Sequence, residues 1–100
     1  MIIDNSHPVK PMIKVVKEYY NTPSEIELME RLADILRGIV SWAEIKICGD
    51  PKNRTLYLDL DRVTVKQLNM VISVLHEIGE VEEIFGADWV IRISVRLNKR

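Results

Sequence analysis

Two stretches of the chain combine a helix start signal with apolar residues that recur every three or four positions. In the first stretch, Thr22 is followed by Pro23 and Glu25, which is a capping box with proline at the first helical position. In the second stretch, Thr64 and Gln67 make another capping box. Each pattern predicts an amphipathic helix that buries one side.

The buried sides follow from the spacing of the apolar residues. They are expected to be Ile26, Met29, Leu32, Ala33, Leu36 and Ile39 in the first helix and Leu68, Val71, Ile72, Leu75 and Ile78 in the second. Gly38 and Gly79 are expected to stop the helices. Val63 can contact Leu68 as a hydrophobic staple at the start of the second helix.

The remaining stretches alternate apolar and polar residues or are rich in β-branched residues, and these patterns predict strands. The expected strands span residues 12–20, 40–48, 55–61, 81–85 and 89–97. Residues 49–54 are dense in turn formers and predict an antiparallel hairpin between the second and third strands. The predicted order is therefore strand–helix–strand twice, with a final strand that extends the last one.

This order predicts a fold class and a domain layout. Two right-handed crossovers would place both helices on one face of an antiparallel sheet. The sequence therefore predicts an α+β fold, a ferredoxin-like αβ sandwich (βαββαβ plus a C-terminal strand extension). Residues 12–97 are expected to form this single domain, after an irregular lead-in (residues 1–11) and before a basic tail (residues 98–100). The similar pattern of the two halves is consistent with a duplicated unit.

One face of such a sheet carries no helix, and the sequence places its candidate functional residues there. An antiparallel sheet can leave one face open to solvent. The alternation of side chains assigns to this face a possible nucleic-acid-binding or partner-binding set: Lys14, Lys46, Tyr57, Arg92 and Arg96.

The leading hypothesis is a small, non-enzymatic, cytoplasmic interaction module that forms a homodimer. The strand at residues 89–97 is expected to be a long edge strand with one apolar side, which tends to find a partner. The open sheet face is the other expected contact surface. Trp89 is expected in the core, whereas Trp42 is expected to be partly exposed and available for an interface.

The second hypothesis is nucleic-acid binding by the basic residues of the open face, with Tyr57 as a stacking platform. Lys99 and Arg100 would lengthen this basic stripe. Asp59 and Glu18 would oppose phosphate, and a solvated, charge-paired strand explains the same residues. The formal net charge of -1 argues against a basic footprint over the whole chain.

Residues with catalytic or metal-binding chemistry are few, so we expect no enzyme activity, cofactor or metal. Asp59 and Asp61 lie on the same side of a predicted strand, as in two-metal sites, but no glycine-rich phosphate loop accompanies them. His7 and His76 lack partners at metal-ligand spacing. Cys48 is the only cysteine, which excludes an intrachain disulfide.

The composition suits one globular domain, with 47% hydrophobic and 29% charged residues. A single cysteine fits a reducing cytoplasm. We expect no signal peptide, and no apolar run approaches the roughly 20 residues that span a bilayer. Gln67 is the only glutamine among many Ile, Val, Glu, Lys and Arg residues, a bias typical of thermophile proteins.

Residues 58–93 read as a strand, a helix ending at Ile78-Gly79, and Val81 leading into another strand. This layout resembles ACT regulatory domains and the effector-binding domain of Lrp/AsnC regulators. The resemblance implies binding of amino acids or similar effectors between subunits, and it gives the third hypothesis, a small-molecule-binding regulatory domain. The ligand loop of those families carries a glycine-containing turn, whereas this chain has Asn21-Thr-Pro-Ser, which matches a helix cap. No site residues are carried over.

Overall fold

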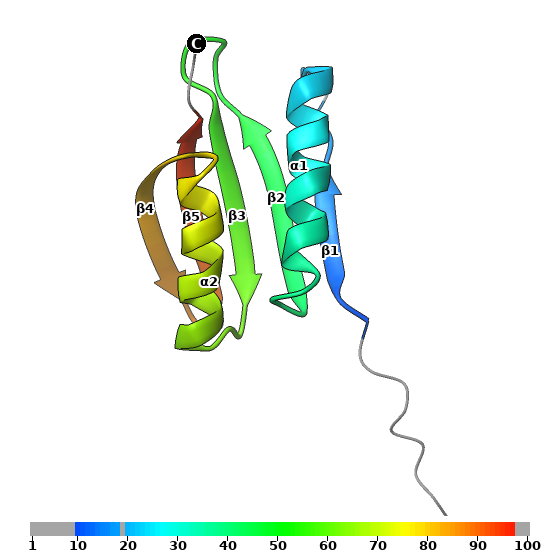
Figure 1. Cartoon of the computed structure of the whole chain (residues 1–100). Helices are drawn as coiled ribbons and strands as arrows, with labels where there is room; N and C mark the ends of the chain where they lie inside the picture. Colours follow the sequence, from blue (N-terminus) through cyan, green and yellow to red (C-terminus); the bar gives the residue numbers. More distant parts are fainter. Residues whose placement is uncertain (1–9, 19, 98–100) are drawn as a thin grey trace, which may run out of the picture.

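A computed structural model describes residues 10–18 and 20–97, which form two helices and one five-stranded mixed sheet (Figure 1). The elements in chain order are β1 (Met12–Val16), α1 (Pro23–Leu36), β2 (Trp42–Cys48), β3 (Thr55–Asp61), α2 (Val65–His76), β4 (Gly79–Ala87) and β5 (Val90–Leu97). The predicted α+β class and the order of elements are confirmed. The predicted tail, most of the lead-in, and His7, Lys99 and Arg100 lie outside the described residues.

Both helices begin at their predicted caps. The hydroxyl of Thr22 accepts the backbone N–H of Glu25, and the Glu25 carboxylate accepts that of Thr22, both at 3.1 Å. Thr64 and Gln67 make the same reciprocal pair at 3.1 and 2.8 Å. These bonds satisfy N–H groups that have no partner inside the helix. Each helix ends a few residues before the glycine that was expected to stop it.

The core lies between the sheet and the two helices, which both cover the same face (Figure 1). Its buried members are Met29, Leu32, Ala33, Leu36, Val40, Ala43, Ile45, Ile47, Leu56, Leu58, Leu60, Val71, Leu75, Ile93 and Val95. Buried and half-buried residues alternate strictly along β2 and β3, because successive strand side chains point to opposite faces. The buried residues of α1 and α2 all belong to the two predicted apolar stripes, so the inner positions of both stripes are confirmed.

The strand order is β1-β2-β3-β5-β4, which differs from the predicted ferredoxin-like order. β1 is an edge strand and pairs in parallel with β2. The pairs β2–β3, β3–β5 and β5–β4 are antiparallel, so the sheet is mixed and not purely antiparallel. The two halves of the chain also pair differently. β5 inserts between β3 and β4, whereas β3 lies outside the β1–β2 pair.

The hand of the first crossover explains this order. In Figure 1, β1 and β2 point upward behind α1, and β2 lies to the left of β1, which is a left-handed crossover. β3 and β4 point downward behind α2, and β4 again lies to the left, which is right-handed. Two right-handed crossovers that start from antiparallel strands would run in opposite directions across the sheet, so the two strand–helix–strand units would interleave. Here both step the same way, so the two units lie side by side. Nearly all such crossovers in proteins are right-handed, and the prediction assumed this hand for both crossovers of this chain.

β5 is an internal strand, so the prediction of a C-terminal edge strand is wrong. Ile93 of β5 pairs with Leu58 of β3 and with Ile84 of β4. β5 does not extend β4, because Asp88 and Trp89 turn the chain back between them, with a φ of 57° at Asp88. Trp89 was expected in the core and is instead 69% exposed. It stands in this turn, where strand alternation does not set the direction of a side chain.

β4 is the second edge strand and is longer than predicted. A bulge interrupts its pairing between Val81 and Glu83. Gly79 opens the strand, where an added Cβ would lie 2.2 Å from the carbonyl oxygen of Arg96. This glycine therefore permits close approach of β5 and does not act as the predicted helix stop.

Candidate functional site

The residues predicted for the functional face all lie on the side of the sheet opposite the helices, which we call the open face. The sheet register places them in two neighbouring rows and at one end of β5. One row runs Lys14, Glu44, Asp59, Arg92, Phe85, and the next runs Val16, Lys46, Tyr57, Ser94, Glu83. Each row thus carries both basic and acidic residues.

The two arginines of the open face are bound by carboxylates. Arg92 donates two hydrogen bonds to Asp59, at 2.8 and 3.0 Å, and its guanidinium carbon lies 5.6 Å from the centre of the Tyr57 ring. The hydrogen bond to Asp59 raises the pKa of Arg92. Arg96 lies 2.6 Å from a carboxylate oxygen of Glu82. The positive charge of these two arginines is therefore offset locally.

The residues considered for metal or acid–base chemistry have other partners or stand apart. Asp59 binds Arg92, and Asp61 lies 3.7 Å from Arg62. His76 is exposed at the end of α2. Over residues 10–18 and 20–97, no group of three or more His, Cys, Asp or Glu side chains gathers at metal-binding distance.

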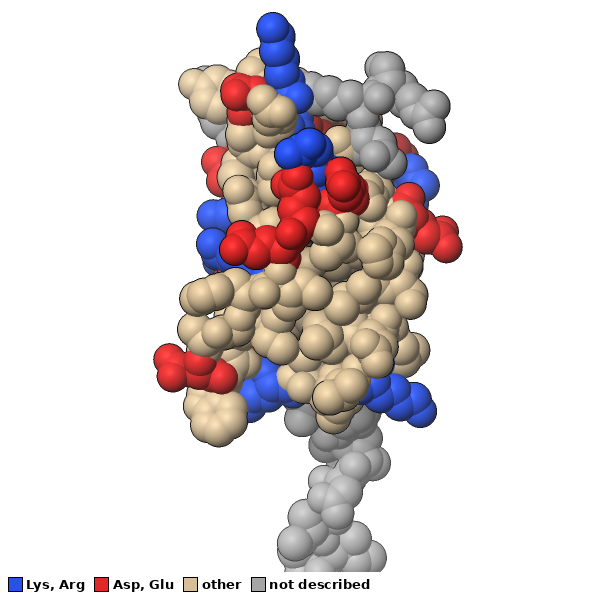
Figure 2. Space-filling view, turned by 90° about the vertical axis from the view of Figure 1, so that its left-hand side faces the viewer, with Lys and Arg blue, Asp and Glu red and all other residues tan. Residues whose placement is uncertain are grey.

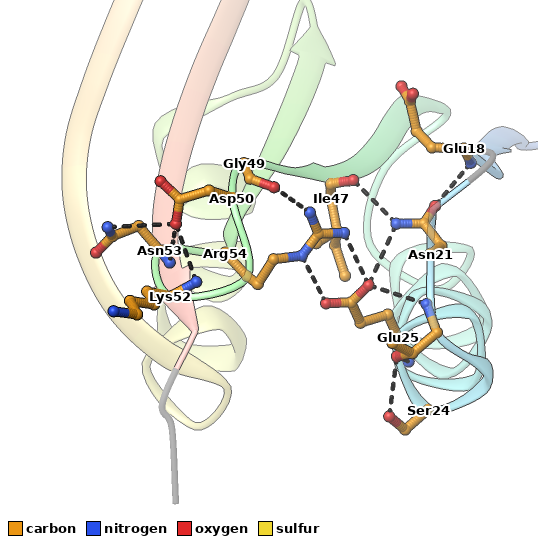
Figure 3. Close-up of polar contacts among 11 residues, drawn as sticks. Glu18, Asn21, Ser24, Glu25, Ile47, Gly49, Asp50, Lys52, Asn53 and Arg54 are labelled. Atoms are coloured by element: carbon orange, nitrogen blue, oxygen red, sulfur yellow. Dashed lines mark hydrogen bonds and ion pairs between the residues drawn. The ribbon is translucent and has the colours of Figure 1, made fainter.

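A polar cluster at the start of α1 was not predicted from the sequence (Figure 3). Arg54 donates from Nε and Nη2 to the two carboxylate oxygens of Glu25, both at 2.9 Å. Its third nitrogen donates to the carbonyl of Gly49. The side-chain amide of Asn21 donates to the carbonyl of Ile47 at 3.0 Å and to Glu25 at 3.3 Å. The cluster joins α1 to the β2–β3 loop.

This cluster borders a cleft of about 480 Å³ that Cys48 also lines. The Arg54 guanidinium holds the pKa of Glu25 below its ordinary value of 4.5. Because all three nitrogens of Arg54 donate to groups of the protein and its charge is paired with Glu25, the cluster stabilises the β2–β3 loop. The sequence indicated only one member of this cluster, Glu25, as part of the predicted cap of the first helix. The partner Arg54 comes from a segment that local patterns could not connect to it.

An exposed apolar surface lies along β4 and the turn that follows it. It consists of Ile84 (47% exposed), Phe85 (60%), Trp89 (69%) and Val90 (41%), and we call it the β4 apolar surface. Figure 2 shows this side of the molecule as a broad uncharged field, with both acidic and basic side chains above it and at its lower end. Sequence reasoning missed this surface because it placed Trp89 in the core and residues 89–97 at the edge.

The two central residues of this surface point to opposite sides of the sheet. Ile84 lies on the helix side, beside the fully buried Ile93, and Phe85 lies on the open side, beside Arg92. The helix layer therefore covers β5 but not the middle of β4. The middle of this edge strand therefore exposes a large apolar side chain on each side of the sheet, and such exposure is unfavourable in water.

The turn end of the surface is held in place by Arg62. The backbone N–H of Arg62 donates to the carbonyl of Trp89 at 2.9 Å, and its guanidinium lies 6.0 Å from the centre of the Trp89 ring. A cleft of about 370 Å³ opens beside them and is also lined by Trp42, which is half-buried, as predicted. The aromatic ring is therefore fixed at the surface, with a cation beside it.

The backbone of β4 presents hydrogen-bonding groups on its outer side. The two-residue turn makes Ala87 and Val90 a hydrogen-bonded pair, and such pairs alternate along an antiparallel ladder. Phe85 therefore bonds toward β5, whereas the N–H and C=O groups of Ile84 and Gly86 point away from it. In the described part of the chain, no strand pairs with this outer side.

Comparisons of the sequence and structure with protein-family models, curated proteins and solved structures gave no match. The resemblance of residues 58–93 to ACT and Lrp/AsnC domains thus rests on the layout of β3, α2 and β4. Neither helix in the described residues is both long and apolar enough to cross a membrane.

Proposed function

We propose that this chain is a small, non-enzymatic interaction module that self-associates through the β4 side of its sheet. The observation that carries the proposal is the exposure of Ile84 and Phe85 on the two sides of an edge strand. Exposed edge strands are ready templates for another strand, and large apolar residues on them favour burial. The open face, which is the other contact surface expected from the sequence, is charge-paired and gains less from burial.

The charges on β4 support selective association. Glu80, Glu82 and Glu83 are exposed at the start of the strand, and charged side chains on an edge discourage indiscriminate pairing. The apolar residues follow at its far end, where Arg62 lies beside Trp89. The apolar far end of β4 is therefore available for contact, whereas the acidic start of the strand discourages indiscriminate pairing.

The test is the molecular mass in solution. Sedimentation of the full chain from about 1 to 100 μM, a range typical of moderate-affinity dimers, is expected to show a species heavier than the 11.6 kDa monomer. Phe85→Lys is expected to shift the chain toward the monomer. Met12→Lys is the matched control, because Met12 is 65% exposed on the opposite edge strand, β1. A clean monomer at every concentration would contradict the proposal.

A second candidate function is nucleic-acid binding by the open face. The observation that favours it is that Lys14, Lys46, Tyr57, Arg92 and Arg96 share one side of the sheet. Binding of a labelled single strand should weaken as salt rises and should fall in the double variant Arg92→Ala with Arg96→Ala. Binding that is insensitive to salt or to these changes would rule the function out.

A further inference from the structure

We infer that the partner of β4 is the same strand of a second copy of this chain, paired antiparallel about a two-fold axis at Phe85. The inference rests on the proposed function and specifies its contact. It is drawn from the regular part of the β4 ladder, from the direction of its backbone groups and from the position of its charges.

The bulge determines where the axis falls. β4 pairs regularly with β5 from residue 83 to residue 87, and the irregularity lies between Val81 and Glu83. The midpoint of the regular segment is Phe85. Antiparallel pairing of two such segments sets Phe85 against Phe85 of the second copy, Ile84 against its Gly86, and Glu83 against its Ala87.

The backbone groups match in this register. Ile84 and Gly86 carry the N–H and C=O groups that point away from β5, and the register places these two residues opposite each other. The two symmetric Ile84–Gly86 pairs would form about four hydrogen bonds, since each such pair exchanges two. If one strand were shifted by one residue, the N–H and C=O groups that point away from β5 in one copy would face residues of the other copy whose groups point toward its own β5.

The side chains also match. The two Phe85 residues would form a non-hydrogen-bonded pair, in which cross-strand side chains approach most closely, and aromatic pairs are favourable there. On the helix side, each Ile84 would lie against Gly86, which presents no side chain. The space above Gly86 is open, because the nearest atom to an added Cβ is a side-chain carbon of Ile91 at 3.9 Å.

The charges select this register over its neighbours. An axis at Glu83 or Glu82 would place a glutamate against its own copy, and like charges directly opposite are destabilising. Antiparallel pairing also turns the second copy upside down. The start of β4 in one molecule then faces the turn of the other, where Arg62 and Asp88 both lie beside Trp89.

The first experiment is cysteine cross-linking in a Cys48→Ser chain. Phe85→Cys places two thiols across the axis, and a non-hydrogen-bonded pair has a Cα separation of about 4.5 Å, within the range that a disulfide spans. Under mild oxidation, this variant is expected to form linked dimers at least tenfold faster than Met12→Cys, which carries a similarly exposed cysteine on the other edge strand. Equal rates would overturn the inference.

The second experiment is Gly86→Pro, which removes an outward N–H on an edge strand, where proline is tolerated. It is expected to retain the circular dichroism of the parent chain and to sediment as a monomer. Gly86→Ala keeps the N–H and is expected to associate like the parent. If Gly86→Pro alters the circular dichroism, the cross-linking result decides.

The outcomes separate the inference from the proposed function. A parent chain that associates while Phe85→Cys fails to cross-link, and Gly86→Pro still associates, would overturn the β4 pairing and leave self-association through another surface. A parent chain that never associates would end both.

Discussion

Arg54 binds Glu25 through two parallel hydrogen bonds of 2.9 Å, although the two residues are separated by 29 positions in the chain. Both side chains are only 14% exposed. Glu25 also accepts the backbone N–H of Thr22, so one carboxylate caps α1 and fixes the loop between β2 and β3. The local structure at the start of the helix and the packing of the sheet therefore depend on the same side chain.

Replacement of Glu25 by alanine should destabilise the protein by about 2–4 kcal/mol, because it leaves the mostly buried Arg54 without its partner and removes part of the α1 cap. Urea unfolding followed by circular dichroism measures the change. Glu27→Ala is the control, since Glu27 forms an exposed pair with Arg31 at 3.4 Å in the same helix. Its loss should cost less than about 0.5 kcal/mol. Equal losses would show that the buried pair has no special role.

The same pair should make stability depend on pH. The hydrogen bond from Arg54 lowers the pKa of Glu25 in the folded state below its ordinary value of 4.5. The unfolded chain therefore binds the proton more readily, so this contribution is fully present above pH 4.5 and is lost as the pH falls through the lowered pKa. Urea midpoints measured from pH 7 down to pH 2 should fall more steeply for the parent than for Glu25→Gln. Parallel curves would contradict the assignment.

Gly79→Ala should be one of the most damaging small substitutions in the chain. The added Cβ would meet the carbonyl oxygen of Arg96 at 2.2 Å, and both atoms belong to paired strands that cannot separate without losing hydrogen bonds. We expect a loss of about 2–3 kcal/mol in thermal or urea unfolding. Gly38→Ala is the comparison, because its nearest contact would be an ordinary 3.6 Å. Similar effects of the two changes would argue against close approach at Gly79.

Arg92 and Asp59 should be energetically coupled. A double-mutant cycle of Arg92→Ala and Asp59→Ala should give a coupling of about 0.5–1 kcal/mol, because the pair is bidentate but Arg92 remains half exposed. The coupling should shrink at 1 M salt, where charges at the surface are screened. A coupling that is zero at low salt would mean that the open face is not organised by this pair.

Local patterns predicted those parts of the fold that depend on neighbouring residues. The caps at Thr22 and Thr64 and the alternation of β3 are properties of short segments, and the structure has them where the sequence indicated. The grouping of Lys46, Tyr57 and Arg92 on one face follows from the same period of two. The ion pairs that bind the arginines of this face depend on register between strands, which no single segment encodes.

The errors have a common origin. Trp89 was assigned to the core because it begins an alternating run, yet that run starts only after the turn at Asp88. Residues 89–97 were assigned to the sheet edge, although a position between β3 and β4 satisfies the same alternation. The alternation that includes Ile93 and Val95 fits either position, so the sequence pattern could not distinguish them.

The sequence by itself determined the elements, their caps and the side that each one buries, since these depend on turn chemistry and on periods of 3.6 and two residues. Only the tertiary structure decided which strands are neighbours, because the hydrogen-bonding groups of a strand edge are the same whatever its sequence. That choice placed β4 at the edge, beyond the cover of the helices, and left Ile84 on the helix side and Phe85 on the open face in contact with water.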